Sequence, residues 1–166
     1  SGEKIAQSTG KLAISKPNLA NWHTLTPDEL AIISDGNDVW FYDPWIEQVS
    51  VYSLSAAIAK TPILLLTSQD ESLWEQYSVT KLSDDDLTTE RFVISANDVN
   101  SQIKSLTLMF DTVSDHSQLK QFSFLDATGQ LSHIRLTNFE DKNPPNLSLF
   151  RFEIPEGIQV DDQRSN

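Results

Sequence analysis

The sequence predicts a mainly β fold: a curved antiparallel sheet of about ten strands with a short helical insert. Apolar residues alternate with polar ones over most of the chain, which is the period of a β-strand. Turn-forming residues separate these alternating segments, and only the segment from about 54 to 75 has a helical pattern. No repeat or long linker divides the 166 residues. We therefore expect a single domain over residues 1–166.

The first half of the chain is typical of a meander of antiparallel strands. Alternation runs from Lys11 to Tyr52, and turn-like segments interrupt it at Lys16–Asn18, Thr26–Asp28, Ser34–Asn37 and Asp43–Pro44. A two-residue turn at Asp35–Gly36 would pair Ile32 with Val39 and Leu30 with Phe41. These four apolar residues would then share one face.

The opposite face of the same predicted hairpin is also apolar. Side chains alternate across a strand, so this second face carries Ala31, Ile33, Trp40 and Tyr42. A sheet with one face in water would not need apolar residues on both faces. Either a second layer covers the far face, or one face lines an apolar hollow. The four tryptophans and eight phenylalanines are also consistent with an ordinary sandwich core that has no ligand cavity.

The middle of the chain predicts two short helices. The first covers 54–60, and the second begins with Thr61 as N-cap and Pro62 at the first helical position. Its run Ile63–Leu66 is apolar on all sides, as expected of a helix between two surfaces. Strand patterning then resumes, with acidic, serine-rich loops between the strands, and the last of these strands is expected at Leu149–Ile154. We expect strands in sequence-neighbour order, with this insert acting as a lid.

Charge and composition exclude several classes of function. Aspartate and glutamate number 24 against 12 lysine and arginine, a net charge of −12 that disfavours nucleic acid and anionic headgroups. The absence of cysteine excludes disulfides and thiol chemistry. The longest apolar run, Ile63–Leu66, is far shorter than the roughly 20 residues of a membrane helix, so we expect no stable membrane insertion.

The sequence offers no convincing catalytic or metal-binding motif. The aspartates 84–86 lack the glycine and ligand spacing of a calcium loop and are expected in a solvated loop. Ser114-Asp115-His116 is a loop tripeptide, whereas the members of a catalytic triad meet through the fold. We expect no enzyme, no cofactor and no metal. A hydrolase that uses acidic loops is the remaining catalytic alternative.

Five motifs in register carry a family resemblance. They are 16–22 (Lys-Pro-Asn-Leu-Ala-Asn-Trp), 34–36 (Ser-Asp-Gly), 40–49 (from Trp-Phe-Tyr-Asp-Pro to Glu-Gln-Val), 61–65 (Thr-Pro-Ile-Leu-Leu) and the ending 155–164. With these motifs the sequence resembles the outer-membrane lipoprotein carrier family, LolA, over nearly its whole length. The resemblance implies a half-open antiparallel β-barrel with a short helical lid, whose apolar hollow receives lipoprotein acyl chains.

The resemblance also implies partners and a location. Members of the family are soluble periplasmic chaperones of Gram-negative bacteria, exported with a signal peptide and involved in outer-membrane biogenesis. They take lipoproteins from an inner-membrane ABC transporter and hand them to an outer-membrane receptor. A monomer is expected. The alternative is a related lipid-binding module, either the outer-membrane receptor itself or a periplasmic lipoprotein sensor.

The alternation of side chains along each strand, together with the family resemblance, predicts the site residues. The expected acyl-binding hollow comprises Ile14, Ala20, Trp22, Leu30, Ile32, Val39 and Phe41. The expected lid and latch comprise Lys16, Pro62, Ile63, Leu64, Leu65 and Leu66. Lys16 stands where the family usually has an arginine that latches the closed lid, and Ala20 where it often has a large apolar residue that accepts cargo.

The resemblance further implies an amphipathic helix and a first strand ahead of the position of Ser1, which this sequence does not contain. We expect the strand Lys11–Lys16 to be an edge of the sheet, or to pair with a neighbouring molecule.

Overall fold

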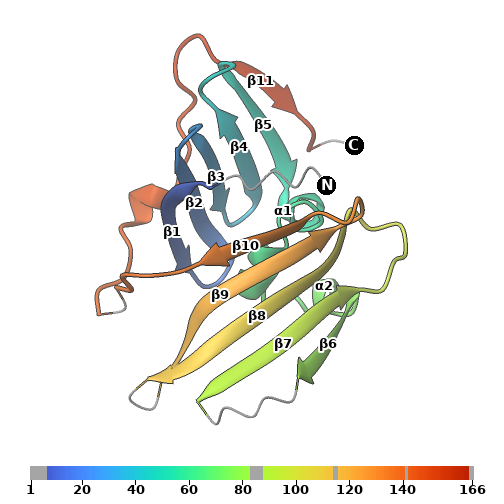
Figure 1. Ribbon diagram of the computed structural model, residues 1–166. Coiled ribbons are helices and arrows are strands. Elements are labelled where there is room, and N and C mark those ends of the chain that lie inside the picture. Colours follow the sequence, from blue (N-terminus) through green and yellow to red (C-terminus); the bar gives the residue numbers. More distant parts are fainter. Residues whose placement is uncertain (1–6, 83–87, 114–115, 141, 165–166) are drawn as a thin grey trace. The chain divides into compact units, whose positions relative to one another are not determined.

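The computed structural model describes residues 7–82, 88–113, 116–140 and 142–164, and it is mainly β (Figure 1). Eleven strands form two sheets over these residues, close to the expected ten. The chain divides into two compact units. The first unit comprises Ser1–Ile58, Leu66–Gln69 and Pro144–Asn166, and the second comprises Ala59–Leu65 and Asp70–Asn143. The single domain over 1–166 stays a prediction.

The sheet of the first unit contains six strands: β1 (Thr9–Ser15), β2 (Leu19–Thr26), β3 (Leu30–Asp35), β4 (Asp38–Asp43), β5 (Gln48–Ser53) and β11 (Gln159–Asp162). Their order is β1-β2-β3-β4-β5-β11, so β1 lies at an edge among the described strands, as expected. The expectation of purely antiparallel, sequence-neighbour pairing is wrong at β11, which runs parallel to β5. A parallel pair needs a long connection, and here the chain completes the second unit in between.

The predicted register of the β3–β4 hairpin is wrong by two residues. Ile32 pairs with Phe41 and Ser34 with Val39, and Gly36 and Asn37 lie between the strands, so the two-residue turn is one position further along the chain than predicted. The Asp35 carboxylate causes this, because its Oδ1 accepts hydrogen bonds from the backbone amides of Asn37 (3.0 Å) and Asp38 (2.9 Å). A shift of two residues preserves which side chains share a face.

The same hydrogen bonds lower the pKa of Asp35. Burial by itself would raise this pKa, but bonds from the amides of Asp38 and Asn37 and from the Trp40 indole, 3.2 Å from Oδ2, outweigh it. Asp35 therefore remains a carboxylate that accepts all three bonds at neutral pH.

The helical insert contains three short helices: α1 (Leu54–Ile58), η1 (Pro62–Thr67) and α2 (Glu71–Trp74). The second of them, η1, is a 3₁₀-helix, whereas the sequence analysis expected an ordinary helix there. Asp70 caps α2 by accepting a hydrogen bond from the backbone amide of Ser72. No described helix has the length and apolarity needed to cross a membrane.

The sheet of the second unit is an antiparallel meander in sequence-neighbour order. Its strands are β6 (Tyr77–Leu82), β7 (Thr89–Ala96), β8 (Ile103–Val113), β9 (His116–Asp126) and β10 (Leu131–Arg135). The expected acidic loop at 84–86 lies outside the described residues, as do Ser114 and Asp115 of the loop tripeptide.

The expected strand at Leu149–Ile154 is not formed. Instead, η2 (Leu147–Phe150) begins after Asn146, whose side chain accepts a hydrogen bond from the amide of Ser148 at 3.0 Å. This local hydrogen bond uses the amide of Ser148, which in a strand would be available to a neighbouring strand, and so favours the 3₁₀-helix. The 3₁₀-helix η2 contacts β2 and β3, and Phe150 is only 2% exposed.

Arg164 fastens the end of the chain to the sheet of the first unit. Its guanidinium donates to both carboxylate oxygens of Asp162 (3.0 and 2.7 Å) and to Asp38 (2.9 Å), and it lies over the Trp40 ring. The hydrogen bonds from Arg164 lower the pKa of Asp162 to about 2. β11 is therefore held by ion pairs as well as by its backbone ladder.

This arrangement predicts a pH-dependent attachment of β11. Because the folded-state pKa of Asp162 is lowered, its contribution is complete above about pH 4 and is lost as the pH falls towards 2. An NMR titration should give a midpoint for Asp162 near 2 in the parent protein. In Arg164→Gln the midpoint should rise towards the ordinary value of 3.8. Equal midpoints in the two proteins would show that Arg164 does not hold this carboxylate.

Candidate functional site

The strand register of the first sheet places all seven expected hollow residues on one face. Residues opposite each other in antiparallel strands point to the same side of a sheet. Ile14 is opposite Ala20 and Trp22 is opposite Ile32, while Ile32 is also opposite Phe41. The remaining members, Leu30 and Val39, have the same parity in β3 and β4. We call this side the hollow face, defined by Ile14, Ala20, Trp22, Leu30, Ile32, Val39 and Phe41.

Exposure changes steadily along the hollow face. Leu30, near the start of β3, is 43% exposed, and Ile32 and Phe41 are half-buried. Val39 is fully buried and Ala20 is 3% exposed. The hollow face is therefore open to water at the Leu30 end and closed at the Val39 end.

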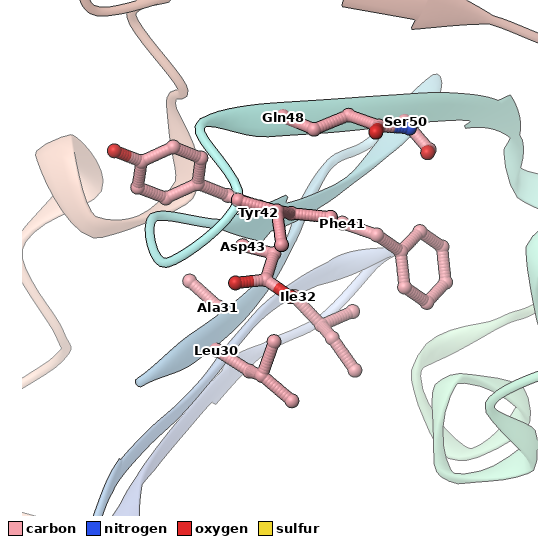
Figure 2. Close-up of a pocket in the computed structure, with 9 residues that line it drawn as sticks. Leu30, Ala31, Ile32, Phe41, Tyr42, Asp43, Gln48 and Ser50 are labelled. Atoms are coloured by element: carbon pink, nitrogen blue, oxygen red, sulfur yellow. The ribbon is translucent and has the colours of Figure 1, made fainter. Parts of the chain in front are cut away.

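An open pocket of about 220 Å³ lies at the open end of the hollow face. Figure 2 shows Leu30, Ile32 and Phe41 in its wall, with Tyr42 pointing to the opposite side of β4 from Phe41. The other lining residues are Ala31, Asp43, Ile46, Gln48 and Ser50. The wall is thus mostly apolar, with a few polar groups towards β5.

Ile46, Gln48 and Ser50 line the pocket but were not among the predicted site residues. These three residues alternate with period two, which was a sufficient signal to place them on one face. Gln48 and Ser50 are polar, so they carry no hydrophobic signal for an apolar pocket. The register nevertheless places Ser50 directly opposite Phe41.

The other face of this sheet is covered by the C-terminal segment. Ile33, Val49 and Val51 are buried on it, and the Phe152 ring stacks on Trp40 with centroids 5.4 Å apart. The Asn21 side chain donates a 2.7 Å hydrogen bond to the backbone carbonyl of Leu149. Of the two explanations for a doubly apolar sheet, a second layer therefore applies to this face, and the pocket lies on the hollow face.

The expected lid residues form η1, whose apolar side chains are mostly buried. Ile63, Leu64 and Leu65 are 3%, 2% and 0% exposed, Leu66 is half-buried, and Pro62 is the first residue of η1. The expected latch residue, Lys16, lies in the turn between β1 and β2 and is exposed. Its role in holding η1 stays a prediction.

Backbone groups near Lys16 do hold the end of η1. The amide of Asn18 donates to the carbonyl of Thr67 at 3.0 Å, and the Ser34 hydroxyl donates to the carbonyl of Asn18 at 2.5 Å. Ser34 and Thr67 are fully buried. Asn18 has a φ of 68°, a left-handed conformation that asparagine tolerates better than most residues. The Pro17-Asn18 pair predicted a turn, but the sequence did not predict the hydrogen bond between Asn18 and Thr67.

The sheet of the second unit also has one apolar face, none of whose residues was among the predicted site residues. Phe92 is opposite Leu108, which is opposite Phe122, and the Phe92 and Phe110 rings meet edge to face with centroids 6.0 Å apart. The opposite face carries polar side chains such as Thr107 and Ser123. The alternation in 105–110 and 119–125 was a sufficient signal for this face.

The pocket has the chemistry of a binding site for an apolar ligand. Among the described side chains, no group of three histidine, aspartate or glutamate residues is arranged to hold a metal ion. An open, mostly apolar pocket with a few polar groups suits a ligand with hydrocarbon surface. The fold and the site define a β-sheet protein with an apolar binding face.

Comparison with known proteins names the family. The model of the outer membrane lipoprotein carrier protein LolA matches residues 1–153. The outer-membrane lipoprotein carrier protein of Haemophilus influenzae is 40% identical over 164 residues, covering 99% of this chain and 75% of the relative. Those of Aliivibrio fischeri and Aeromonas salmonicida are 37% and 34% identical over 163 residues, covering 98% of this chain and 77% and 76% of the relatives. The chain belongs to the LolA family.

Membership in this family confirms the resemblance inferred from the five motifs. It also agrees with the expectation that the chain is not an enzyme, because the family consists of carrier proteins.

Proposed function

We propose that this protein carries lipoproteins through the periplasm by covering their acyl chains on the hollow face. The observation that supports this most directly is the apolar face of the first sheet, with its pocket beside Leu30, Ile32 and Phe41. A chain of about 16 carbons gains on the order of 13 kcal/mol on leaving water, at about 0.8 kcal/mol per methylene. A lipoprotein therefore needs a cover of this kind to cross an aqueous compartment.

The proposal includes the half-open barrel and the route of the cargo. The carrier receives lipoproteins from an inner-membrane ABC transporter and passes them to an outer-membrane receptor. Family membership and the names of the relatives as outer-membrane lipoprotein carriers support this route. The apolar hollow face of the first sheet supports the acyl-binding part of this proposal.

Release requires that something compete with the cargo. The proposed competitor is η1, because its residues Ile63–Leu65 are buried and its last residue, Thr67, is held by the amide of Asn18. Cargo and a closed lid would then exclude each other, and the carrier gives up its cargo when a partner stabilises the closed state or takes the acyl chain.

The proposal is tested by binding of a triacylated lipopeptide to the purified protein. Saturable binding of the acylated peptide, with no binding of the same peptide without acyl chains, is the expected result. Mass spectrometry of the protein isolated from a periplasmic extract should show lipoproteins bound to it. Equal binding of the acylated and unacylated peptides would contradict a carrier that recognises acyl chains.

Lys16→Leu tests the latch part of the proposal. A cation near the carbonyl end of a helix stabilises it by about 0.3–1 kcal/mol, so losing Lys16 should weaken the closed state. Loading with the lipopeptide should be unchanged, whereas transfer to the receptor should slow by about two- to fivefold. Lys11→Leu, on the exposed part of β1, is the control and should transfer at the parent rate. Equal transfer by both variants would assign Lys16 to the solvated turn alone.

A further inference from the structure

The turn between β4 and β5 displays two large apolar side chains to water. Trp45 is 86% exposed and Ile46 is 60% exposed. The turn is well held, because Asp43 accepts a hydrogen bond from the amide of Trp45 at 3.0 Å and Pro44 accepts one from the amide of Glu47 at 3.3 Å. The fold therefore presents Trp45 and Ile46 in a defined position.

The far side of this turn is anchored as well. The carbonyl of Glu47 accepts a hydrogen bond from the amide of Gln159 at 2.9 Å, which joins the turn to the start of β11. Glu47 itself has a φ of 54°, a left-handed conformation that few residues adopt without a structural constraint. This turn therefore keeps the large apolar surface of Trp45 in contact with water.

This exposed pair is continuous with the pocket. Ile46 lines the pocket together with Leu30 and Phe41, and Trp45 precedes it in the chain. The pocket, at about 220 Å³, is smaller than the roughly 300–1,000 Å³ that encloses a drug-sized ligand. A long acyl chain cannot be covered by the pocket alone and needs apolar surface beyond it.

The exposure gradient on the hollow face orients such a ligand. The methyl end of an acyl chain avoids water, whereas the group that links it to a peptide is polar and loses free energy when buried without a partner. The closed end of the hollow face is at Val39, and the open end is at Leu30, beside Ile46. The methyl end therefore points towards Val39 and the linkage lies at the turn.

We propose that Trp45 and Ile46 form the mouth of the acyl site and cover the carbons nearest the polar end of the cargo. This inference rests on the proposed carrier function and adds to it the direction in which the cargo lies. The occupant of the exposed pair is an acyl chain leaving the pocket.

Brominated lipopeptides test the direction, because bromine quenches tryptophan emission at short range. The contribution of Trp45 is the difference in emission between the parent protein and Trp45→Phe. Bromines near the carbonyl end of the acyl chain should reduce this contribution strongly, and bromines near the methyl end should leave it nearly unchanged. Equal quenching by both probes, or the reverse order, would overturn the proposed orientation.

Affinity provides a second and independent readout. Trp45→Ser should weaken lipopeptide binding by about fivefold or more, because the ligand loses part of its apolar cover. Val99→Ser is the matched control: Val99 is 79% exposed in the second unit, and its replacement should leave the affinity unchanged. Both side chains are so exposed that neither variant should unfold the protein.

The outcomes separate this inference from the proposed function. If the parent protein does not bind the lipopeptide, the carrier function itself fails. If the parent binds but Trp45→Ser binds equally well, the mouth lies elsewhere and only this inference fails. If Trp45→Ser keeps its affinity but passes cargo to the receptor more slowly, the turn is a docking surface for a protein partner, which also overturns the inference.

Discussion

Ile32→Glu weakens lipopeptide binding by more than about tenfold while the protein remains folded, a loss of about 1.4 kcal/mol or more. Ile32 lines the pocket and is opposite Trp22 on one side and Phe41 on the other. A carboxylate here keeps water in the pocket, and covering it with an acyl chain costs several kcal/mol in lost hydration. Fluorescence titration with the lipopeptide measures the loss, and a thermal melt checks the fold.

Leu25→Glu is the control for added charge. Leu25 lies in β2, is 42% exposed and does not line the pocket. This variant adds the same negative charge to the first unit, so its binding should match that of the parent protein. Tight binding by a folded Ile32→Glu protein, or equal losses in both variants, would remove the hollow face as the acyl site.

Phe150→Ala destabilises the first unit by about 3–5 kcal/mol. Phe150 is 2% exposed in η2, which contacts β2 and β3, so its removal leaves a cavity on the covered face of the sheet. The free energy of unfolding is measured by urea denaturation, with tryptophan emission as the signal. Trp22, Trp40 and Trp45 all report on the first unit.

Leu147→Ala is the matched control in the same 3₁₀-helix. Leu147 is 63% exposed, so its truncation should change the free energy of unfolding by no more than about 0.5 kcal/mol. A loss below 1 kcal/mol for Phe150→Ala would mean that the covered face does not depend on η2.

The strands and their faces were predictable because alternation depends only on neighbouring residues. The hairpin at β3–β4 shows the limit of this reasoning. Its register differs by two residues from the prediction, since the position of the turn depends on hydrogen bonds to the Asp35 carboxylate. The face assignment of Ile32 and Phe41 survived, because a shift of two residues leaves every side chain on the same side.

The contacts that depend on distant parts of the chain were not predictable. The 3₁₀-helix η2 forms where a strand was expected. The parallel pairing of β11 with β5 was not predicted, because it joins segments that no hairpin connects. The carbonyl of Thr67 accepts a hydrogen bond from the amide of Asn18, and nothing in the sequence near either residue predicts this contact. The pocket residues Gln48 and Ser50 were not predicted, because a polar side chain gives no hydrophobic signal for a place in an apolar pocket.

By itself the sequence determined a mainly β chain, two apolar faces on its first sheet and the family to which the motifs belong. It did not determine which of those faces a second layer covers. The tertiary structure decided this by placing the C-terminal segment against one face, as in the bond from Asn21 to Leu149, 128 positions away. The physical reason is that both faces are apolar and would gain a similar free energy from burial. Which face becomes covered depends on contacts between residues far apart in the chain.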